Sequence, residues 1–363
     1  MTLRRRAIST SWRARVPIAC GSDDADLTAL DRLSMDEWMQ SRGYTAPRLR
    51  WFVEYACRDD FGCTLADTSA WAAIHYFAAR HDEGRTADLL TWPEGNARLV
   101  THMARAAGSR VETGVLALDV KPLARGVEVL AFRPATNEAE RITAEQVIVC
   151  VPRAMAARLV APWREQPPAF LREFQSGAWL VANLSLARAP SSRGFPIAWD
   201  NVFFRSKSLG YVVATHQLDP GGCAPAPGDP CSRRAPTNRG ESVWTWYLPL
   251  TDHDPAAARR ALLAMSWRDA ADLAIADLVR AHKDIARCVT RLDAWRWGHA
   301  MVRPHQGFLW GGARAAASQP LGDIHFAHSD LGGLPLFEEA QYHGVRAAEA
   351  ILAARGIGYE TLL

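Results

Sequence analysis

The sequence has almost no lysine and no long apolar run. Lysine occurs only at Lys121, Lys207 and Lys283, whereas Lys and Arg together number 42 and the net charge is +3. So strong a preference for arginine reflects base composition rather than a basic binding surface, and we expect no nucleic-acid partner. No segment reaches the ~18 consecutive apolar residues that a membrane span needs, so we expect no membrane span.

The cysteines and the start of the chain exclude further classes of protein. The seven cysteines form no C-x-x-C pair, and neither Cys57 nor Cys63 has a partner at zinc-ligand spacing. We therefore expect a reducing compartment, a cytoplasmic location, no disulfide framework and no metal site. The basic opening of the chain is interrupted at Trp12-Arg13-Ala14-Arg15 instead of leading into an apolar run, so it is not an export signal. Residues 1–26 are expected to form a loose N-terminus.

The residues that are present suit a large folded chain. Of the 363 residues, 48% are hydrophobic, which is enough for a large core and favours two domains. Residues 30–82 predict a helical block, because Ser34-Met35-Asp36-Glu37 is a capping box, Pro47 opens a second aromatic-rich helix and Asp67-Thr68-Ser69 precedes a third.

The pattern changes after Trp92-Pro93-Glu94-Gly95. A helix over 97–107 is followed by short strands, and Gln146 to Pro152 is a continuous apolar run, which is typical of a strand buried on both faces of a parallel sheet. Further strands are predicted over 179–186, 211–215, 243–248 and 323–327, and further helices over 255–264, 266–282 and 335–354. Residues 219–240 are rich in Pro, Gly and Cys and are expected to form an exposed, dispensable loop.

Two stretches of the sequence carry motifs. The first leads from the P-x-G turn at Pro93 to Val147-Ile148-Val149-Cys150-Val151-Pro152. The second is Ile324-His325-Phe326-Ala327-His328-Ser329-Asp330, followed by the helix from Phe337 to Ala348. Together they resemble the flavin-containing amine oxidase family, which includes monoamine oxidases, amino-acid oxidases and relatives of the carotenoid desaturases. The resemblance covers residues 30–354 loosely.

The resemblance implies an α/β fold in which a flavin domain of the doubly wound, FAD/NAD(P)-binding type is interleaved with an α+β substrate domain. The flavin-side domain would use residues 86–160 and 303–355, and the substrate-side domain 27–85 and 161–302. The implied cofactor is FAD and the implied partner is a small-molecule substrate. The residues implied at the flavin are Val115, Asp330, Glu338, Glu339 and Ala340.

Each of these residues also has an ordinary structural interpretation. Val115 would meet the adenine through its backbone and Asp330 a ribityl hydroxyl, but an Asp before two glycines is also common turn chemistry. Glu338 and Glu339 stand in the first turn of the closing helix, where acidic side chains stabilise the helix dipole. That helix start would also stabilise negative charge on a reduced flavin.

Dense aromatic residues precede the second stretch. Trp295, Trp297, His299 and Trp310 are candidates for the substrate cavity by resemblance, while core packing or a satisfied structural histidine is the competing interpretation. No catalytic acid–base pair is needed, because the flavin carries the oxidation and the protein supplies position and electrostatics.

The sequence departs from the family in the element that would receive the flavin pyrophosphate. No G-x-G-x-x-G motif occurs anywhere in the chain. Two functions therefore stay open. One is FAD-dependent oxidation of an amine or of an unsaturated lipid-like substrate. The other is a truncated, non-catalytic remnant with an incomplete flavin domain, which would bind FAD weakly or not at all.

Overall fold

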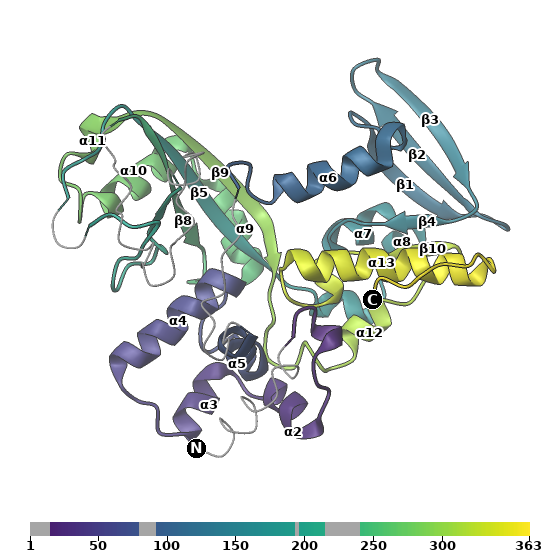
Figure 1. Ribbon diagram of the computed structural model, residues 1–363, viewed down its shortest axis with the longest axis horizontal. Coiled ribbons are helices and arrows are strands. Elements are labelled where there is room, and N and C mark those ends of the chain that lie inside the picture. The colour runs from purple at the N-terminus through teal and green to yellow at the C-terminus, as the bar shows by residue number, and fades with distance from the viewer. Residues whose placement is uncertain (1–14, 80–91, 193–195, 215–239) are drawn as a thin grey trace. The chain divides into compact units, whose positions relative to one another are not determined.

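The computed structural model describes residues 15–79, 92–192, 196–214 and 240–363 (Figure 1). The predicted loop over 219–240, apart from Gly240, and the first part of the predicted loose N-terminus lie outside these residues. The chain divides into two compact units. Unit 1 comprises Met1–Thr86, Ala107–Gln175 and Met301–Leu363, and unit 2 comprises Ala87–Ala106 and Ser176–Ala300. Among the described residues, no helix is long and apolar enough to cross a membrane.

Unit 1 includes the helical block that the sequence predicts. Its helices are α2 (Ala25–Thr28), α3 (Met35–Ser41), α4 (Pro47–Phe61) and α5 (Ala70–Ala79). The capping box of α3 is confirmed, because the Glu37 backbone N–H donates to Ser34 Oγ at 3.2 Å and the Ser34 N–H donates to Glu37 Oε2 at 2.8 Å. Pro47 begins α4 as predicted, and Gly62 ends it with a φ of 58°.

The helical block is tied to the segment that follows residue 300. The Ser69 backbone N–H donates to the Pro304 carbonyl at 2.9 Å, and Arg303 Nη2 lies 2.8 Å from Asp67 Oδ2. Residues 27–85 therefore share unit 1 with 107–175 and 301–363. The boundaries drawn from the sequence differ, since they group 27–85 with 161–302.

The strands of unit 1 form two small sheets. One is an antiparallel sheet in the order β1-β2-β3, and the other is the parallel pair β4 and β10, with Val147 opposite Ile324 and Val149 opposite Phe326. The strands are β1 (Leu116–Pro122), β2 (Val127–Arg133), β3 (Glu138–Ala144), β4 (Val147–Val149) and β10 (Ile324–Phe326). Within the described residues, the parallel part of the expected doubly wound sheet is thus this one pair.

Helices of unit 1 pack around the parallel pair. They are α7 (Arg153–Leu159), α8 (Ala161–Glu165), α12 (Ala313–Ala317) and α13 (Phe337–Ala354), and Figure 1 shows α13 in yellow beside β10. Trp163, Ile324, Phe326 and Leu331 are buried together in the core between them, so apolar burial joins the two motif-bearing stretches of the sequence.

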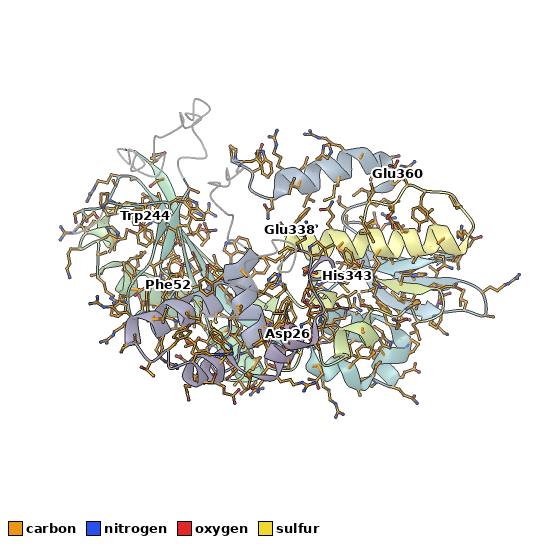
Figure 2. All side chains as sticks on the ribbon, turned by 60° about the horizontal axis from the view of Figure 1, so that its bottom comes forward. Asp26, Phe52, Trp244, Glu338, His343 and Glu360 are labelled. Carbon is orange, nitrogen blue, oxygen red and sulfur yellow. The ribbon has the colours of Figure 1, made fainter. Side chains whose placement is uncertain are left out.

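Unit 2 is built on a five-stranded sheet in the order β6-β7-β8-β5-β9. Its strands are β5 (Ser176–Leu186), β6 (Asp200–Asn201), β7 (Tyr211–Val213), β8 (Ser242–Pro249) and β9 (Val289–Val302), and its helices are α6 (Ala97–Ala107), α9 (Pro255–Ala264), α10 (Trp267–Leu278) and α11 (Ile285–Cys288). Helices α9 and α10 pack against β5 and cover a core that includes Leu184, Trp244 and Leu262. Figure 2 labels Trp244 in this sheet.

Strands β3 and β9 have no counterpart among the predicted strands. In β3 the side chains are mostly exposed, and in β9 they follow no two-residue alternation of buried and exposed positions. Without that alternation the strand period is not visible in the sequence.

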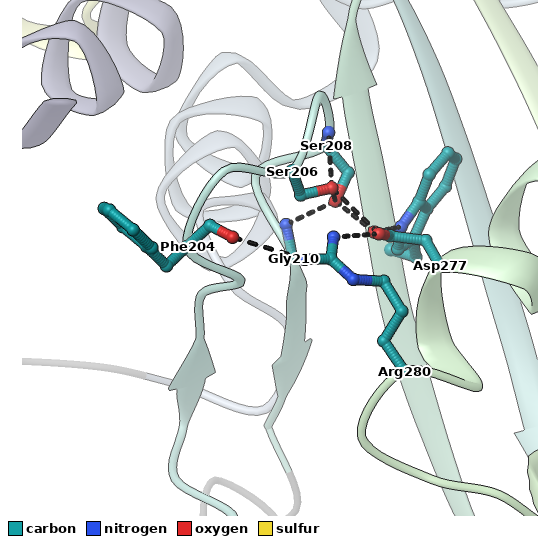
Figure 3. Close-up of polar contacts among 7 residues, drawn as sticks. Phe204, Ser206, Ser208, Gly210, Asp277 and Arg280 are labelled. Atoms are coloured by element: carbon teal, nitrogen blue, oxygen red, sulfur yellow. Dashed lines mark hydrogen bonds and ion pairs between the residues drawn. The ribbon is translucent and has the colours of Figure 1, made fainter.

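A largely buried carboxylate, 12% exposed, holds one end of the unit 2 sheet together. Asp277 on α10 accepts hydrogen bonds from Ser206 Oγ at 2.8 Å, from Trp246 Nε1 at 3.0 Å, from Arg280 Nη1 at 3.1 Å and from Ser208 Oγ (Figure 3). Ser208 Oγ in turn accepts the Gly210 backbone N–H at 3.0 Å. These donors come from the loop before β7, from β8 and from the end of α10, so one charge fixes three segments of unit 2.

Candidate functional site

The carboxyl ends of β4 and β10 lie at one edge of the parallel pair, because parallel strands run in the same direction. The Ala327 backbone N–H donates to the Val149 carbonyl at 3.1 Å, which brings the two motif-bearing stretches of the sequence together. Ligands of open parallel sheets bind beyond this edge. Asp330 follows β10 here, and Arg153 follows β4.

Asp330 is buried and both of its carboxylate oxygens have partners. Oδ2 accepts the backbone N–H of Arg153 at 2.8 Å, and Oδ1 lies 3.2 Å from His328 Nδ1. Burial works against the charged carboxylate, but the hydrogen bond and charge of His328 and the Arg153 N–H outweigh it, and the pKa of Asp330 is lowered. Asp330 is therefore ionised and anchors the start of α7, a role that the sequence does not reveal.

Arg153 is the residue at this edge that sequence reasoning misses. Its side chain is 0% exposed, and Nε, Nη1 and Nη2 all lack a hydrogen-bond acceptor among the described residues. The guanidinium lies over the Phe326 ring at 4.8 Å and the Trp163 ring at 5.8 Å, and these two rings stack at 4.4 Å. Burial lowers the pKa of Arg153 to about 10, so the group stays charged at neutral pH.

The aromatic contacts do not account for this buried charge. A desolvated cation–π contact is worth about 2 kcal/mol. The effective cost of removing an ion from water is several kcal/mol, and a lost hydrogen bond to a charged donor adds to it. Arg153 is thus a buried charged donor that has no anionic acceptor among the described residues. The only sequence signal is an arginine directly after the strand-ending Pro152, and it is hidden by the general excess of arginine.

The start of α13 carries a second buried charge. Glu339 is 0% exposed, its Oε1 accepts the Ile18 backbone N–H at 2.6 Å, and its Oε2 has no partner among the described residues. Burial raises the pKa of Glu339 to about 7, against the opposing effects of the Ile18 N–H and of Arg314. Its predicted neighbours in the site, Glu338 and Ala340, are exposed. Besides lying in the first turn of α13, Glu339 therefore holds the backbone of Ile18 through a buried hydrogen bond.

Several basic side chains lie near one another in this part of unit 1. His343 on α13, labelled in Figure 2, is 6% exposed, and its Nδ1 has no partner among the described residues. Burial first, and then the charges of Arg346, Arg314, Arg153 and His328, lower the pKa of His343 to about 3. We call Arg153, Arg314, His328, His343 and Arg346 the basic cluster. His343 is uncharged at neutral pH, so the positive potential of the cluster comes from its arginines, and it favours an anion over a cation.

Two glycines shape the turn between β10 and α13. A Cβ on Gly332 would meet Glu339 Oε2 at 2.0 Å. Gly333 has a φ of +79°, and a Cβ there would lie 2.6 Å from Leu309 Cδ2. Arg314 Nη1 donates to the Gly332 carbonyl at 2.8 Å. The turn is thus packed too tightly for side chains, and it holds Asp330 and Glu339 in place.

The remaining predicted site residues lie in different places. Val115 is half-buried just before β1, a strand that packs on α7 and α8, and its contact with adenine stays a prediction. Trp295, Trp297 and His299 lie on β9 and are exposed, and the two tryptophan rings stack with centroids 6.2 Å apart. Trp310 lies in unit 1, half-buried, edge-on to Trp71 at 5.7 Å.

Comparison with known proteins gives the fold and little else. No protein-family model matches this chain, and no curated protein matches its sequence. Wild-type putrescine oxidase bound to putrescine is 17% identical, with a TM-score of 0.66 over 97% of this chain and 74% of that one. Cyclohexylamine oxidase from Brevibacterium oxydans IH-35A is 15% identical, with a TM-score of 0.58 over 98% of this chain and 74% of that one. The chain therefore has a mixed α/β fold that is shared with amine oxidases.

Proposed function

We propose that this chain is an FAD-dependent oxidoreductase that oxidises an amine. The observation that carries the proposal is the likeness of fold to putrescine oxidase and cyclohexylamine oxidase over nearly the whole chain. Fold alone does not give a function. The two motif-bearing stretches, which resemble flavin-containing amine oxidases and meet at one sheet edge, support the same reaction.

The flavin-side residues would be those at the carboxyl edge of β4 and β10. The Asp330 carboxylate would accept a hydrogen bond from a ribityl hydroxyl, Val115 would meet the adenine, and the first turn of α13 would face the flavin ring. Asp330 suits this role because it is ionised and held rigidly by Arg153 N–H and His328. The unpartnered guanidinium of Arg153 fits the anionic part of such a cofactor.

The substrate-side residues would be the aromatic side chains of β9. Bound FAD supplies a hydride acceptor, and the protein has to hold the amine in position. Trp295 and Trp297 offer parallel ring faces, and a tryptophan face is the best aromatic partner for an ammonium group. Trp310 stays a candidate from the resemblance alone, and its ring packs against Trp71 within unit 1.

The test is reduction of bound flavin. The purified chain is mixed with excess FAD, desalted, made anaerobic and combined with putrescine, cyclohexylamine or an unsaturated fatty acid. We expect retained flavin absorbance that bleaches with an amine and not with the fatty acid. Bleaching by the fatty acid alone would move the substrate to the unsaturated lipid class. Retention of no flavin, together with no amine turnover, would favour the non-catalytic remnant.

A further inference from the structure

The basic cluster contains a donor set that none of the described residues uses. Arg153 has three buried nitrogens without acceptors, and Arg346 Nε and His343 Nδ1 are also buried without partners. Most buried polar groups are hydrogen-bonded, so a group of unused donors on neighbouring elements calls for an explanation. The missing partner of these donors has to carry acceptor oxygens and negative charge.

The carboxylates of the region do not supply them. Asp330 is engaged by the Arg153 backbone N–H and by His328, and forms no ion pair with the Arg153 guanidinium within 4.0 Å. Glu339 accepts the Ile18 N–H, and burial raises its pKa to about 7, which reduces its charge at neutral pH. Arg314 interacts with Glu339 and with the buried Asp31, so the excess of positive charge lies at Arg153 and Arg346, beside which Asp330 is the one carboxylate of the described residues that acts on Arg153.

The position of Arg153 suits a ligand rather than a structural pair. It is the first residue of α7, immediately beyond the carboxyl end of β4, at the edge of a parallel sheet where ligands bind. A guanidinium can bind two oxygens of a phosphate at once, which is geometry that no other side chain offers.

We propose that Arg153, with Arg346 and His343 beside it, binds a phosphate group. Where that phosphate belongs to FAD, the inference rests on the proposed function. In that case the Arg153 guanidinium would neutralise the pyrophosphate that a G-x-G-x-x-G turn binds in related folds. Free pyrophosphate and ADP share the same chemistry. Riboflavin lacks phosphate and serves as the probe that separates ring recognition from phosphate recognition.

The experiment is calorimetric titration of the full chain with pyrophosphate, ADP, FAD and riboflavin, for the wild type, Arg153→Met and Arg158→Met. Arg158 is the matched control, because it is an exposed arginine on the same helix α7. We expect Arg153→Met to weaken pyrophosphate, ADP and FAD about tenfold or more, since a charge-assisted bidentate contact is lost. Riboflavin binding and the Arg158→Met variant should be unchanged.

Thermal unfolding without ligand separates this role from a structural one. Replacing an unpartnered buried charge by an apolar side chain of similar length should leave the melting temperature unchanged or raise it. Loss of stability in Arg153→Met without ligand, together with unchanged binding of all four probes, would overturn the proposal. Should the methionine variant fail to fold, Arg153→Lys keeps the charge and must bind pyrophosphate more weakly than the wild type.

The result also distinguishes this inference from the proposed function. Flavin retention and amine oxidation that are both insensitive to Arg153→Met would refute the phosphate site and leave the oxidase standing. Arg153-dependent binding of pyrophosphate and ADP, without any amine oxidation, would support the phosphate site and refute the oxidase. Wild-type protein that binds neither pyrophosphate, ADP nor FAD would refute the site directly.

Discussion

Asp277 in unit 2 and Arg153 in unit 1 are both charged side chains removed from water, but their surroundings are opposite. Asp277 accepts hydrogen bonds from Ser206, Ser208, Trp246 and Arg280. The Arg153 guanidinium has no acceptor among the described residues. The carboxylate is matched by donors that come from several segments, whereas the guanidinium lies over the stacked rings of Phe326 and Trp163.

This difference separates a structural charge from a charge kept for a ligand. A buried charge with a complete set of partners fixes the fold, and its removal leaves those partners unsatisfied. A buried charge without partners weakens the fold, and the proposed phosphate ligand would supply the partner that Arg153 lacks. Replacement of Asp277 should therefore lower stability, whereas replacement of Arg153 should weaken ligand binding and leave stability unchanged or raise it.

The largest expected effect is the loss of Asp277. Asp277→Ala leaves Trp246 Nε1 and two serine hydroxyls without their acceptor, and we expect the free energy of unfolding to fall by ~3 to 5 kcal/mol. Denaturant titration, followed by the tryptophan fluorescence of unit 2, measures the loss. The control is Asp272→Ala, an exposed aspartate on the same helix α10. Equal stability of the two variants would mean that the Asp277 network is not what fixes this end of the sheet.

Glu339 provides a pH-dependent version of the same comparison. Its pKa is raised from 4.5 to about 7 by burial, so the folded state holds a proton that the unfolded chain releases. The associated stability is complete below pH 4.5, is lost as the pH rises to about 7, and amounts to about 3 kcal/mol. Glu339→Gln keeps an acceptor for the Ile18 N–H and cannot ionise. We expect it to flatten the pH dependence of stability between pH 4.5 and 7 and to be the more stable protein at pH 8.

Chemical unfolding at several pH values tests this expectation. Glu338→Gln, the exposed neighbour in the same helical turn, is the control and should keep the wild-type pH dependence. A Glu339→Gln variant that loses stability at pH 8 would show that the charged carboxylate is needed, which would contradict the raised pKa of Glu339.

The glycine turn that holds the basic cluster should tolerate no side chain. Gly333→Ala forces a Cβ onto Leu309 and Arg314 and requires an L residue at φ +79°, so we expect a loss of ~1 to 3 kcal/mol. Gly344→Ala is the counterpart, because nothing lies within 4 Å of a Cβ inside α13, and a gain of ~0.5 to 1 kcal/mol is expected. Thermal unfolding of both variants gives the comparison. A gain of stability in both variants would mean that the turn is less tightly packed than the structure shows.

The elements that were predicted from the sequence are those with local signals. The capping box at Ser34, Pro47 at the start of α4 and the apolar run of β4 each depend on residues a few positions apart, and local rules describe them. The parallel pairing of β4 with β10 was not predicted, because it joins two stretches that are distant in the sequence. Strand β9 was missed, because its exposed side chains carry no alternation.

The candidate site residues were drawn from motifs, and their roles stay predictions. Asp330 stands in a recognisable motif, but nothing near it in the sequence shows that its carboxylate accepts the Arg153 N–H across 177 residues. Arg153 itself is one arginine among many, and its burial depends on Phe326 and Trp163, which are distant in the sequence. Burial and hydrogen bonding are properties of the folded chain, so these features require the structure.

The smallest effect on stability is expected at the tryptophan pair of β9. Trp295 and Trp297 are 51% and 53% exposed, so they contribute little burial to the core, although their rings stack at 6.2 Å and 16°. A stacked aromatic pair is worth ~0.5 to 1.5 kcal/mol, and exposure places this pair near the lower value. A double-mutant cycle with Trp295→Ala and Trp297→Ala should therefore give a coupling energy below ~1 kcal/mol by denaturant titration. If the pair binds the amine, the same variants should raise KM for the best amine of the panel, because each removes a cation–π partner of the ammonium group. The absorbance of bound flavin should stay unchanged, because neither tryptophan belongs to the proposed phosphate site. Unchanged KM in both single variants and in the double variant would remove β9 from the substrate site and leave the exposed pair as surface packing.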